Sequence, residues 1–199
     1  QTGLPVIAIS QRRSVISLYY KKEHYILENL PYLISKADHY LRTIANYRQQ
    51  IDSHLNELTY YELNNNSTYE DALRIMQKII FLEKQKLELE KIIIELGTEG
   101  TQIKQSLFEN TFGLRSELSL LFMDYTSNKD NFEHLLEQSK AKEVVDLQAL
   151  AKILEVNPNS LDDSVKTKGY RVLSKIPKLS TYLYLSNNLL LLANHLVLC

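Results

Sequence analysis

Apolar residues recur at a three-and-four spacing along the first half of the chain, and the series starts at Leu27. Nine of its ten positions are apolar, and the tenth is an arginine: Leu27, Leu30, Ile34, Ala37, Leu41, Ile44, Arg48, Ile51, Leu55 and Leu58. This spacing keeps one apolar stripe on one face of an α-helix, so it predicts a single long helix that packs lengthwise in a bundle. Pro31 falls in the first turn of this helix, where its missing N–H costs nothing.

Two more helices are predicted downstream, each bounded by local signals. After a polar break at 63–66, the run Ser67-Thr68-Tyr69-Glu70 has the pattern of a capping box for a helix over 69–96. Two neighbouring apolar stripes along that helix predict a broad buried face, and Gly97 is suited to end it. A third helix is predicted over 101–125. Long helices joined by short breaks pack antiparallel, so the chain is predicted to be mainly α, with a long-helix bundle.

The N-terminal residues follow a different pattern, that of β-strands. Pro5–Ser10 and Val15–Tyr20 are runs rich in β-branched and aromatic residues on either side of the polar stretch 11–14, and they predict two strands with a tight connection. A lone β-hairpin is marginally stable in water, so we expect these strands to complete a larger sheet whose other strands precede Gln1. The alternative is a hairpin that packs on the helices of this chain.

Shorter elements are predicted after Tyr125. Residues 127–130 break the helical pattern, a short helix is predicted over 131–139, and Asp146 is placed to cap a helix over 147–155. We expect a small second domain to begin near residue 131. The stretch 181–199 is apolar and uncharged, but Asn and His interrupt it, and it falls short of the roughly 20 apolar residues that a bilayer requires. It predicts a buried C-terminal helix and no membrane partner.

Composition is typical of a soluble globular protein. The chain has 44% hydrophobic and 24% charged residues over 199 positions, with only five Gly and four Pro, which favours helices over a many-stranded sheet. Cys199 is the only cysteine, which excludes an internal disulfide and suits a reducing cytoplasm. No signal-peptide pattern is visible. Because the chain opens with Gln1 instead of Met, we expect it to be a piece of a longer protein.

Positive charge is concentrated between residues 164 and 180. The whole chain has 23 basic and 24 acidic residues and a formal net charge of −1. The window 164–180 contains no acidic residue and five basic ones: Lys166, Lys168, Arg171, Lys175 and Lys178. Clustered positive charge on an otherwise acidic chain is the electrostatic footprint of a nucleic-acid contact, so these five side chains are the candidate phosphate ligands. The alternative is a solvated loop with scattered lysines.

The sequence contains no motif for a self-contained active site. Its five histidines are scattered along the chain, and four of them are far from the single cysteine, so we predict no metal site. No phosphate-cradling glycine loop, nucleophile elbow or dinucleotide fingerprint occurs. The many Asp and Glu residues of the long helices are typical of solvated faces that pair with Lys or Arg one turn away. We therefore expect no cofactor to be bound by this chain.

Four segments, taken together, resemble one family. They are the strand pair 2–13, the turn Ile94-Glu95-Leu96-Gly97-Thr98-Glu99-Gly100, the helix end Met123-Asp124-Tyr125, and the basic stretch Gly169 to Leu179. Their sequence, order and spacing are similar to those of the DNA integrity scanning (DisA) family, from Gln1 to about Ser180. The resemblance implies an N-terminal diadenylate cyclase domain that condenses two ATP molecules into cyclic di-AMP with Mg or Mn. It also implies a helical linker and a C-terminal helix-hairpin-helix module that binds branched DNA.

The resemblance divides this chain into four parts. Residues 1–27 would be the end of the α/β cyclase domain and 28–130 the helical linker. Residues 131–180 would begin the helix-hairpin-helix region, and 181–199 would be a divergent apolar tail. The family's Asp-Gly-Ala and Arg-His-Arg motifs, which hold metal and nucleotide, would precede Gln1, so we expect no catalytic residue in this chain. The resemblance also implies a homo-octamer that brings two cyclase domains face to face.

Two groups of residues match functional stretches of the family. The group that matches a stretch near the nucleotide pocket and subunit face is Ser10, Gln11, Arg12 and Arg13. The alternative for this group is a polar hairpin connection. At the other end, 176–179 matches the first hairpin of the DNA module. Such hairpins bind backbone phosphate through main-chain N–H groups and nearby Lys or Arg. The sequence departs from the family after Ser180.

Two hypotheses of different classes follow. In the first, the chain is a fragment of a DNA-sensing diadenylate cyclase, whose complete form makes cyclic di-AMP. In the second, it is a noncatalytic helical scaffold that spaces an oligomerising head from a DNA-contacting tail and binds DNA weakly and nonspecifically. An unrelated helical bundle is a third possibility. We expect the first hypothesis to describe the parent protein and the second to describe this chain.

Overall fold

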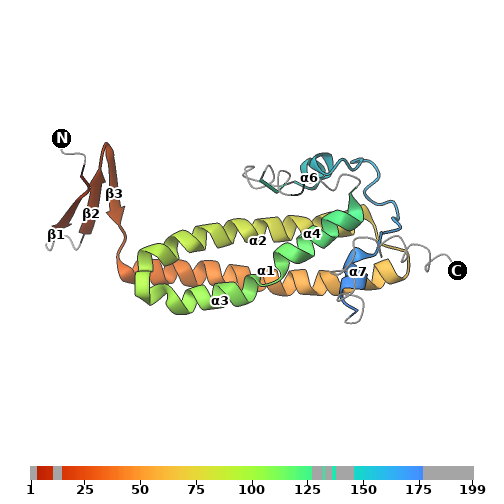
Figure 1. Cartoon of the computed structure of the whole chain (residues 1–199), viewed down its shortest axis with the longest axis horizontal. Helices are drawn as coiled ribbons and strands as arrows, with labels where there is room; N and C mark the ends of the chain where they lie inside the picture. Colours follow the sequence, from red (N-terminus) through yellow and green to blue (C-terminus); the bar gives the residue numbers. More distant parts are fainter. Residues whose placement is uncertain (1–3, 11–14, 127–131, 133–135, 138–145, 177–199) are drawn as a thin grey trace, which may run out of the picture. The chain divides into compact units, whose positions relative to one another are not determined.

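The computed structural model describes residues 4–10, 15–126, 132, 136–137 and 146–176. Most of them are helical, which confirms the predicted mainly α class. The chain divides into two compact units, whose elements are labelled in Figure 1. The first unit consists of Gln1–Arg48 and Leu82–Phe112, and the second of Gln49–Phe81 and Gly113–Cys199. The two longest helices therefore contribute residues to both units.

A three-stranded antiparallel sheet begins the first unit, with strand order β1-β2-β3. β1 (Val6–Ser10) pairs with β2 (Val15–Tyr20), as predicted, and β2 also pairs with β3 (Glu23–Leu27). The sequence pattern does not predict β3, because it assigns the last residue of that strand to the following helix. Lys21 has a φ of 55°, and tight two-residue turns between strands favour such positive values, so the chain reverses there. The predicted hairpin is thus part of a three-stranded sheet.

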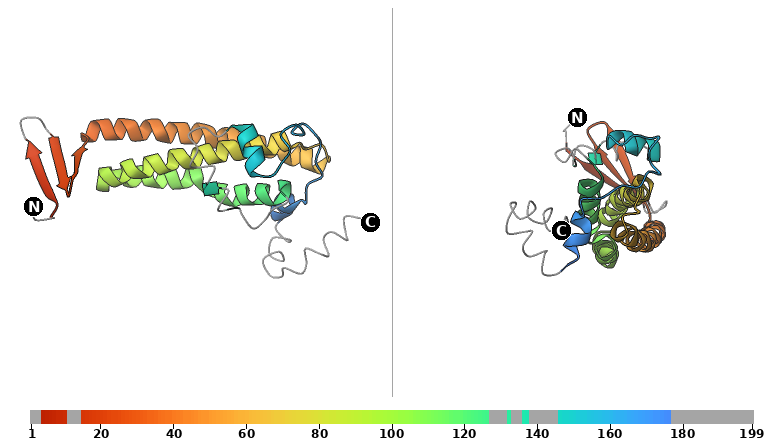
Figure 2. Two further views of the ribbon diagram at one scale, coloured as in Figure 1. Left: turned by 90° about the horizontal axis from the view of Figure 1, so that it is seen from above. Right: turned by 90° about the vertical axis from the view of Figure 1, so that its right-hand side faces the viewer.

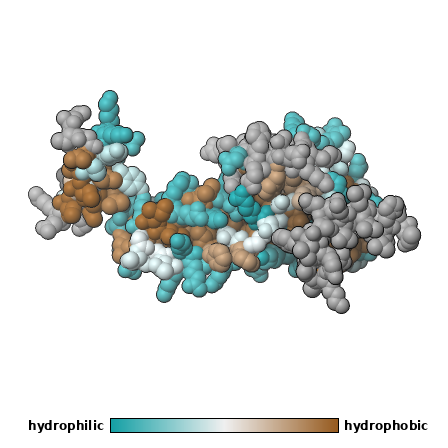
Figure 3. All heavy atoms as spheres, viewed as in Figure 1, coloured by the Kyte–Doolittle hydropathy of each residue, from teal (hydrophilic) through white to brown (hydrophobic). Residues whose placement is uncertain are grey.

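This sheet exposes apolar side chains on both of its faces. Val6 and Ile7 are neighbours on β1 and point to opposite faces, yet 54% and 66% of their surfaces are exposed. Ile9 on β1 and Tyr25 and Ile26 on β3 are exposed as well. Figure 3 shows the brown apolar surface over the strands. The alternation of an ordinary half-buried sheet, with one apolar and one polar face, is missing from these strands.

The helix α1 (Leu30–Leu63) is the long helix that the apolar spacing predicts. The series is buried from its fourth member onward at Ala37, Ile44, Ile51, Leu55 and Leu58. The helix begins three residues later than predicted. Its start is fixed by Asn29, whose side-chain oxygen accepts a hydrogen bond from the N–H of Tyr32 at 2.9 Å.

The helix α2 (Tyr69–Leu96) has the predicted bounds, but its capping box lies one residue later than predicted. The hydroxyl oxygen of Thr68 accepts from the N–H of Asp71 at 3.2 Å, and the carboxylate of Asp71 accepts from the N–H of Thr68 at 3.2 Å. Gly97 has a left-handed φ of 58°, as expected of a helix stop, and a short 3-10 helix, η1 (Gly97–Gly100), follows.

The predicted third helix is wrong as a single element. The structure has α3 (Thr101–Thr111) in the first unit and α4 (Leu114–Tyr125) in the second. Gly113 separates them with a left-handed φ of 77°, which interrupts the run of helical backbone angles. The apolar spacing continues across this break, so the hydrophobic pattern alone does not reveal it.

Two short helices complete the described part of the second unit. The helix α6 (Leu147–Ile153) ends two residues before the predicted bound, because Glu155 takes a positive φ of 58°. Asp146 is its N-cap by position, although its side chain makes no capping hydrogen bond. The helix α7 (Tyr170–Ser174) lies in the basic window. The predicted break at 127–130, most of the predicted helix at 131–139, and the apolar stretch 181–199 lie outside the described residues.

Candidate functional site

The residues predicted to lie near a nucleotide are only partly described. Ser10 ends β1 and pairs with Val15 of β2. Gln11, Arg12 and Arg13 lie outside the described residues. The predicted nucleotide contact of this group therefore stays a prediction.

The five basic residues of the window 164–180 lie in different surroundings. Lys166 and Lys175 are exposed, and Lys175 follows the last turn of α7. Lys178 lies outside the described residues. Lys168 and Arg171 are engaged within the protein, as described below. The window is therefore not a uniform basic surface, and only part of it faces solvent.

The structure corrects the prediction that Arg171 is a phosphate ligand, because its side chain is fully buried in the second unit. Its guanidinium forms an ion pair with the carboxylate of Glu62 near the end of α1, and both side chains are almost completely removed from solvent. Its other donors reach the hydroxyl oxygen of Thr59 at 3.1 Å and the carbonyl oxygen of Leu55 at 3.4 Å. A guanidinium in this position is committed to the protein interior, so it is not available to a DNA phosphate.

The backbone at the start of α7 is held by a second acid, Asp124, in the last turn of α4. One carboxylate oxygen accepts from the N–H of Tyr170 at 2.8 Å, and the other accepts from the N–H of Arg171 at 2.9 Å. The first N–H groups of a helix have no partner within it, and these two are satisfied by a carboxylate from another helix. Gly169 just before them has a φ of 78°, which turns the chain into α7.

Lys168 binds the end of α4 instead of pointing freely into solvent. Its ammonium group donates to the carbonyl oxygen of Thr126 at 2.9 Å and to that of Met123 at 3.4 Å. Carbonyl groups at a helix C-terminus carry partial negative charge, so a cation is stabilised there. The side chain is exposed, but its charge already has partners in the protein.

Burial controls the protonation of this polar cluster. Burial raises the pKa of Asp124, and the negative charge of Glu62 acts in the same direction, while the N–H groups of Arg171 and Tyr170 oppose the shift. Burial also raises the pKa of Tyr125 far above its ordinary value, so its hydroxyl remains protonated. That hydroxyl donates to Glu62 at 3.0 Å. The cluster thus combines two buried acids, one buried cation and a neutral donor.

Sequence reasoning missed the two acids of this cluster. Asp124 had a usable signal, because it is the one charged residue in the apolar run Leu118 to Tyr125. Such a residue is seldom buried without partners. Glu62 also had a signal, since it occupies the next position of the three-and-four series after Leu58, on a stripe that is otherwise almost entirely apolar. The ion pair joins positions 109 residues apart, which no local pattern reports.

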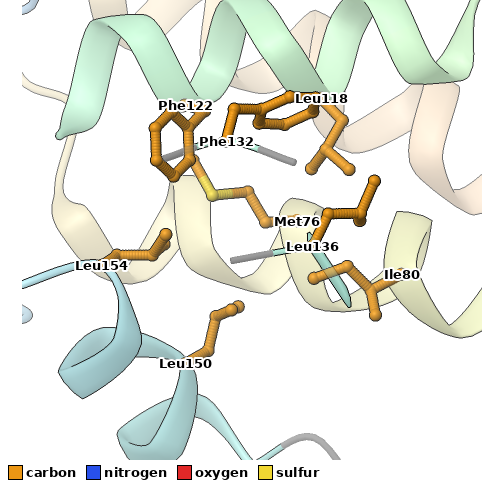
Figure 4. A pocket seen from close by; sticks show the side chains of 8 residues that line it. All are labelled: Met76, Ile80, Leu118, Phe122, Phe132, Leu136, Leu150 and Leu154. Atoms are coloured by element: carbon orange, nitrogen blue, oxygen red, sulfur yellow. The ribbon is translucent and has the colours of Figure 1, made fainter. Parts of the chain in front are cut away.

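An apolar cavity lies elsewhere in the second unit, between α2, α4 and α6 (Figure 4). Its lining side chains contain only carbon and sulfur: Met76, Ile80, Leu118, Phe122, Phe132, Leu136, Leu150 and Leu154. With no polar group to orient a ligand or move a proton, this cavity offers only packing contacts.

A metal site and a membrane-spanning helix are both absent from the part of the chain that the structure describes. No group of three or more His, Cys, Asp or Glu side chains is arranged to hold a metal ion. The expectation that this chain binds no metal cofactor stays a prediction. Over the same described residues, no helix is both long and apolar enough to pass through a membrane.

Comparison with known proteins connects this chain to one family. A family model described as the DisA bacterial checkpoint controller linker region matches residues 27–161. A curated DNA integrity scanning protein DisA from Clostridioides difficile (strain 630) is 35% identical over 186 residues, which cover 91% of this chain and 52% of that protein. The proteins of the same name from Bacillus subtilis (strain 168) and Thermotoga maritima are 35% and 32% identical, over 90% of this chain and 51% and 52% of their own lengths.

The chain spans about half the length of the curated relatives that it matches. The match to the linker region starts beside the predicted linker start at residue 28 and extends past residue 130, through α6 and as far as 161. The predicted domain boundaries stay predictions.

Proposed function

The chain belongs to the DisA family, and from this premise we propose that it supplies the helical linker between a diadenylate cyclase domain and a helix-hairpin-helix DNA-binding module. The observation that carries the proposal is the match of the linker-region family model to residues 27–161. In this proposal the complete protein works in the cytoplasm, forms a homo-octamer and condenses two ATP molecules into cyclic di-AMP. The role of the present chain is that of a noncatalytic scaffold.

The sheet supports the proposal at the N-terminal side. Apolar side chains on both faces of β1, such as Val6 and Ile7, need cover from both directions, as strands inside an α/β domain do. A cyclase domain of which 1–27 is the last part would supply this cover.

The buried polar cluster supports the scaffold role at the other end. Arg171 and Lys168, two of the five cations expected to meet DNA, bind Glu62 and the end of α4 instead. Lys166, Lys175 and Lys178 remain as candidate phosphate ligands in the proposal. Three cations give weak, salt-sensitive binding, because affinity depends on the number of phosphates neutralised.

Incubation of the purified chain with ATP and either Mg²⁺ or Mn²⁺ tests the noncatalytic role. We expect no cyclic di-AMP by mass spectrometry, because the family's metal-binding and nucleotide-binding motifs do not occur in this sequence. A complete DisA protein from one of the relatives, assayed in parallel, is the reference. Turnover by the purified chain that persists through further purification would overturn the proposal.

Titration of fluorescent branched DNA tests the remaining basic surface. The chain is expected to bind weakly, with affinity falling as salt rises. The triple variant Lys166→Glu, Lys175→Glu, Lys178→Glu is expected to abolish this binding at low salt, whereas Lys104→Glu, on α3, is expected to leave it unchanged. Equal binding by the triple variant and the unmodified chain would show that the basic window is not the DNA contact.

A further inference from the structure

Helix α7 lies in the part of the chain that the proposed function assigns to DNA binding, and its own first residues bind it to the linker helices. Asp124 accepts from two consecutive backbone N–H groups, those of Tyr170 and Arg171, at 2.8 and 2.9 Å. Only 4% of the surface of Asp124 is exposed, so the contact is shielded from water. The backbone of α7 is thereby attached to α4 (Figure 2).

The side chain of Arg171 attaches the same turn to a second helix. Its guanidinium reaches Glu62, Thr59 and the carbonyl oxygen of Leu55, all of them in the last turns of α1. One residue thus binds α4 through its backbone and α1 through its side chain. Rotation of α7 about either contact would break the other, so the orientation of α7 is fixed in two directions.

The segment that leads into α7, from Leu161 to Lys168, is hydrogen-bonded to neighbouring elements at several points. The N–H of Val165 donates to the carbonyl oxygen of Ser67 at 2.7 Å, and the hydroxyl of Ser67 donates back to the carbonyl oxygen of Val165 at 3.1 Å. The N–H of Glu70 donates to the carbonyl oxygen of Leu161 at 2.9 Å. Lys168 then holds the end of α4. Leu161, Val165, Lys168 and Arg171 are therefore bound to the first turn of α2, to the turn between α1 and α2, and to α4 and α1.

We infer that Asp124 and Glu62 are positioning residues for DNA binding: they lock α7 onto α4 and α1, so that the linker sets the orientation of α7 and of Lys175, the candidate phosphate ligand that follows it. Release of α7 would carry the Arg171 cation away and leave the two buried acids, Glu62 and Asp124, without these partners, which is costly for charged groups held out of water. Lys175 directly follows α7, so the contacts that fix α7 also fix the position of its backbone. The inference rests on the proposed function only for the part that concerns DNA.

Hydrogen exchange of the whole chain tests the lock without any DNA. The amides of Tyr170 and Arg171 are expected to exchange at least about tenfold more slowly than unstructured peptide. Asp124→Asn is expected to remove most of this protection while leaving the amides of α2 unchanged. Asp163→Asn, an exposed acid of the preceding segment, is the matched control and should change neither. Exchange of the α7 amides at the unstructured rate in the unmodified chain overturns the inference, and so does full protection in Asp124→Asn.

A second measurement separates positioning from simple charge loss. If the lock orients Lys175, Asp124→Asn should reduce the ratio of affinities for branched over linear DNA by several-fold, with the salt dependence unchanged, because the same lysines remain. Lys175→Glu should instead lower the salt dependence by about one phosphate contact. An unchanged ratio in Asp124→Asn overturns the positioning role. Failure of the unmodified chain to bind any DNA sinks the proposed DNA contact, while the exchange result still decides whether the lock exists.

Discussion

The guanidinium of Arg171 and the carboxylate of Glu62 meet inside the second unit, 109 positions apart in the sequence and with side chains 0% and 1% exposed. A charge at this depth is stable only with a matching partner. The pair therefore makes α7, which falls within the predicted DNA-binding region, part of the core of the second unit. It also removes the one arginine of the basic window from solvent.

Replacement of Tyr125 by Phe tests the neutral donor of this cluster. The tyrosine hydroxyl donates to Glu62 at 3.0 Å in a buried position. Its loss leaves the acid with fewer donors, so we expect the free energy of unfolding to fall by about 1–2 kcal/mol. Denaturant unfolding measures this change. Tyr60→Phe, at an exposed position of α1, is the control and should have no measurable effect; an equal loss in both variants would contradict the role assigned to Tyr125.

The raised pKa of Asp124 gives a pH prediction with a definite sign. A folded-state pKa above the ordinary value means that the folded protein binds this proton more tightly than the unfolded chain does. The quantity to follow is the difference in unfolding free energy between the unmodified chain and Asp124→Asn. This difference should fall as pH rises from the ordinary pKa of Asp through the raised pKa of Asp124. Above that window the difference should level off. A difference that rises with pH would mean that hydrogen bonding outweighs burial at this carboxylate.

The break between α3 and α4 depends on a glycine. Gly113 has a φ of 77°, and an added Cβ would meet no atom within 4 Å, so a substitution there suffers backbone strain alone. Gly113→Ala is expected to lower stability by about 1–2 kcal/mol, the cost of left-handed backbone for an ordinary residue. Gly113→Asn should lose less, because Asn adopts this conformation more readily. Stabilisation by Ala would indicate that α3 and α4 form one continuous helix in solution.

The two lysines that flank α7 should respond differently to removal of their charge. Lys168 donates to the carbonyl oxygens at the end of α4, so Lys168→Met is expected to lower stability by about 0.3–1 kcal/mol. Lys175→Met, at an exposed position, should stay within about 0.5 kcal/mol of the unmodified chain. In DNA titrations the order should reverse, with Lys175→Met losing more affinity. Equal stability losses would contradict the assignment of Lys168 to the helix end.

Periodic signals allowed most of the helical fold to be predicted from the sequence. The three-and-four spacing located the buried face of α1, and the apolar stripes and Gly97 gave α2 its observed bounds. These features depend on neighbours within a few turns, which the sequence displays directly. The third strand is not predicted by the sequence pattern, because its short run, Glu23 to Leu27, mixes polar and apolar residues and overlaps the helical series. Gly113 was overlooked because the apolar pattern continues past it.

The candidate site could be predicted only as a region. Charge counting found the window that contains α7, but it did not distinguish Lys168 and Arg171, whose charges have partners within the protein, from the lysines beside them. Whether a basic side chain meets solvent or a buried acid depends on residues far away in sequence, here Glu62 and Asp124. A single charged residue within an apolar run, as at Asp124, is the signal that should be read together with a basic window.

A double-mutant cycle between Glu62 and Arg171 tests the central claim, that α7 is locked into the linker by a buried ion pair. Glu62→Leu and Arg171→Met should each destabilise the chain by about 3–5 kcal/mol, because each strands the other's charge. The double variant should recover much of this loss, with a coupling energy of at least about 2 kcal/mol in denaturant unfolding. Losses that add to within about 0.5 kcal/mol would show that the two side chains act independently, and the lock would not exist.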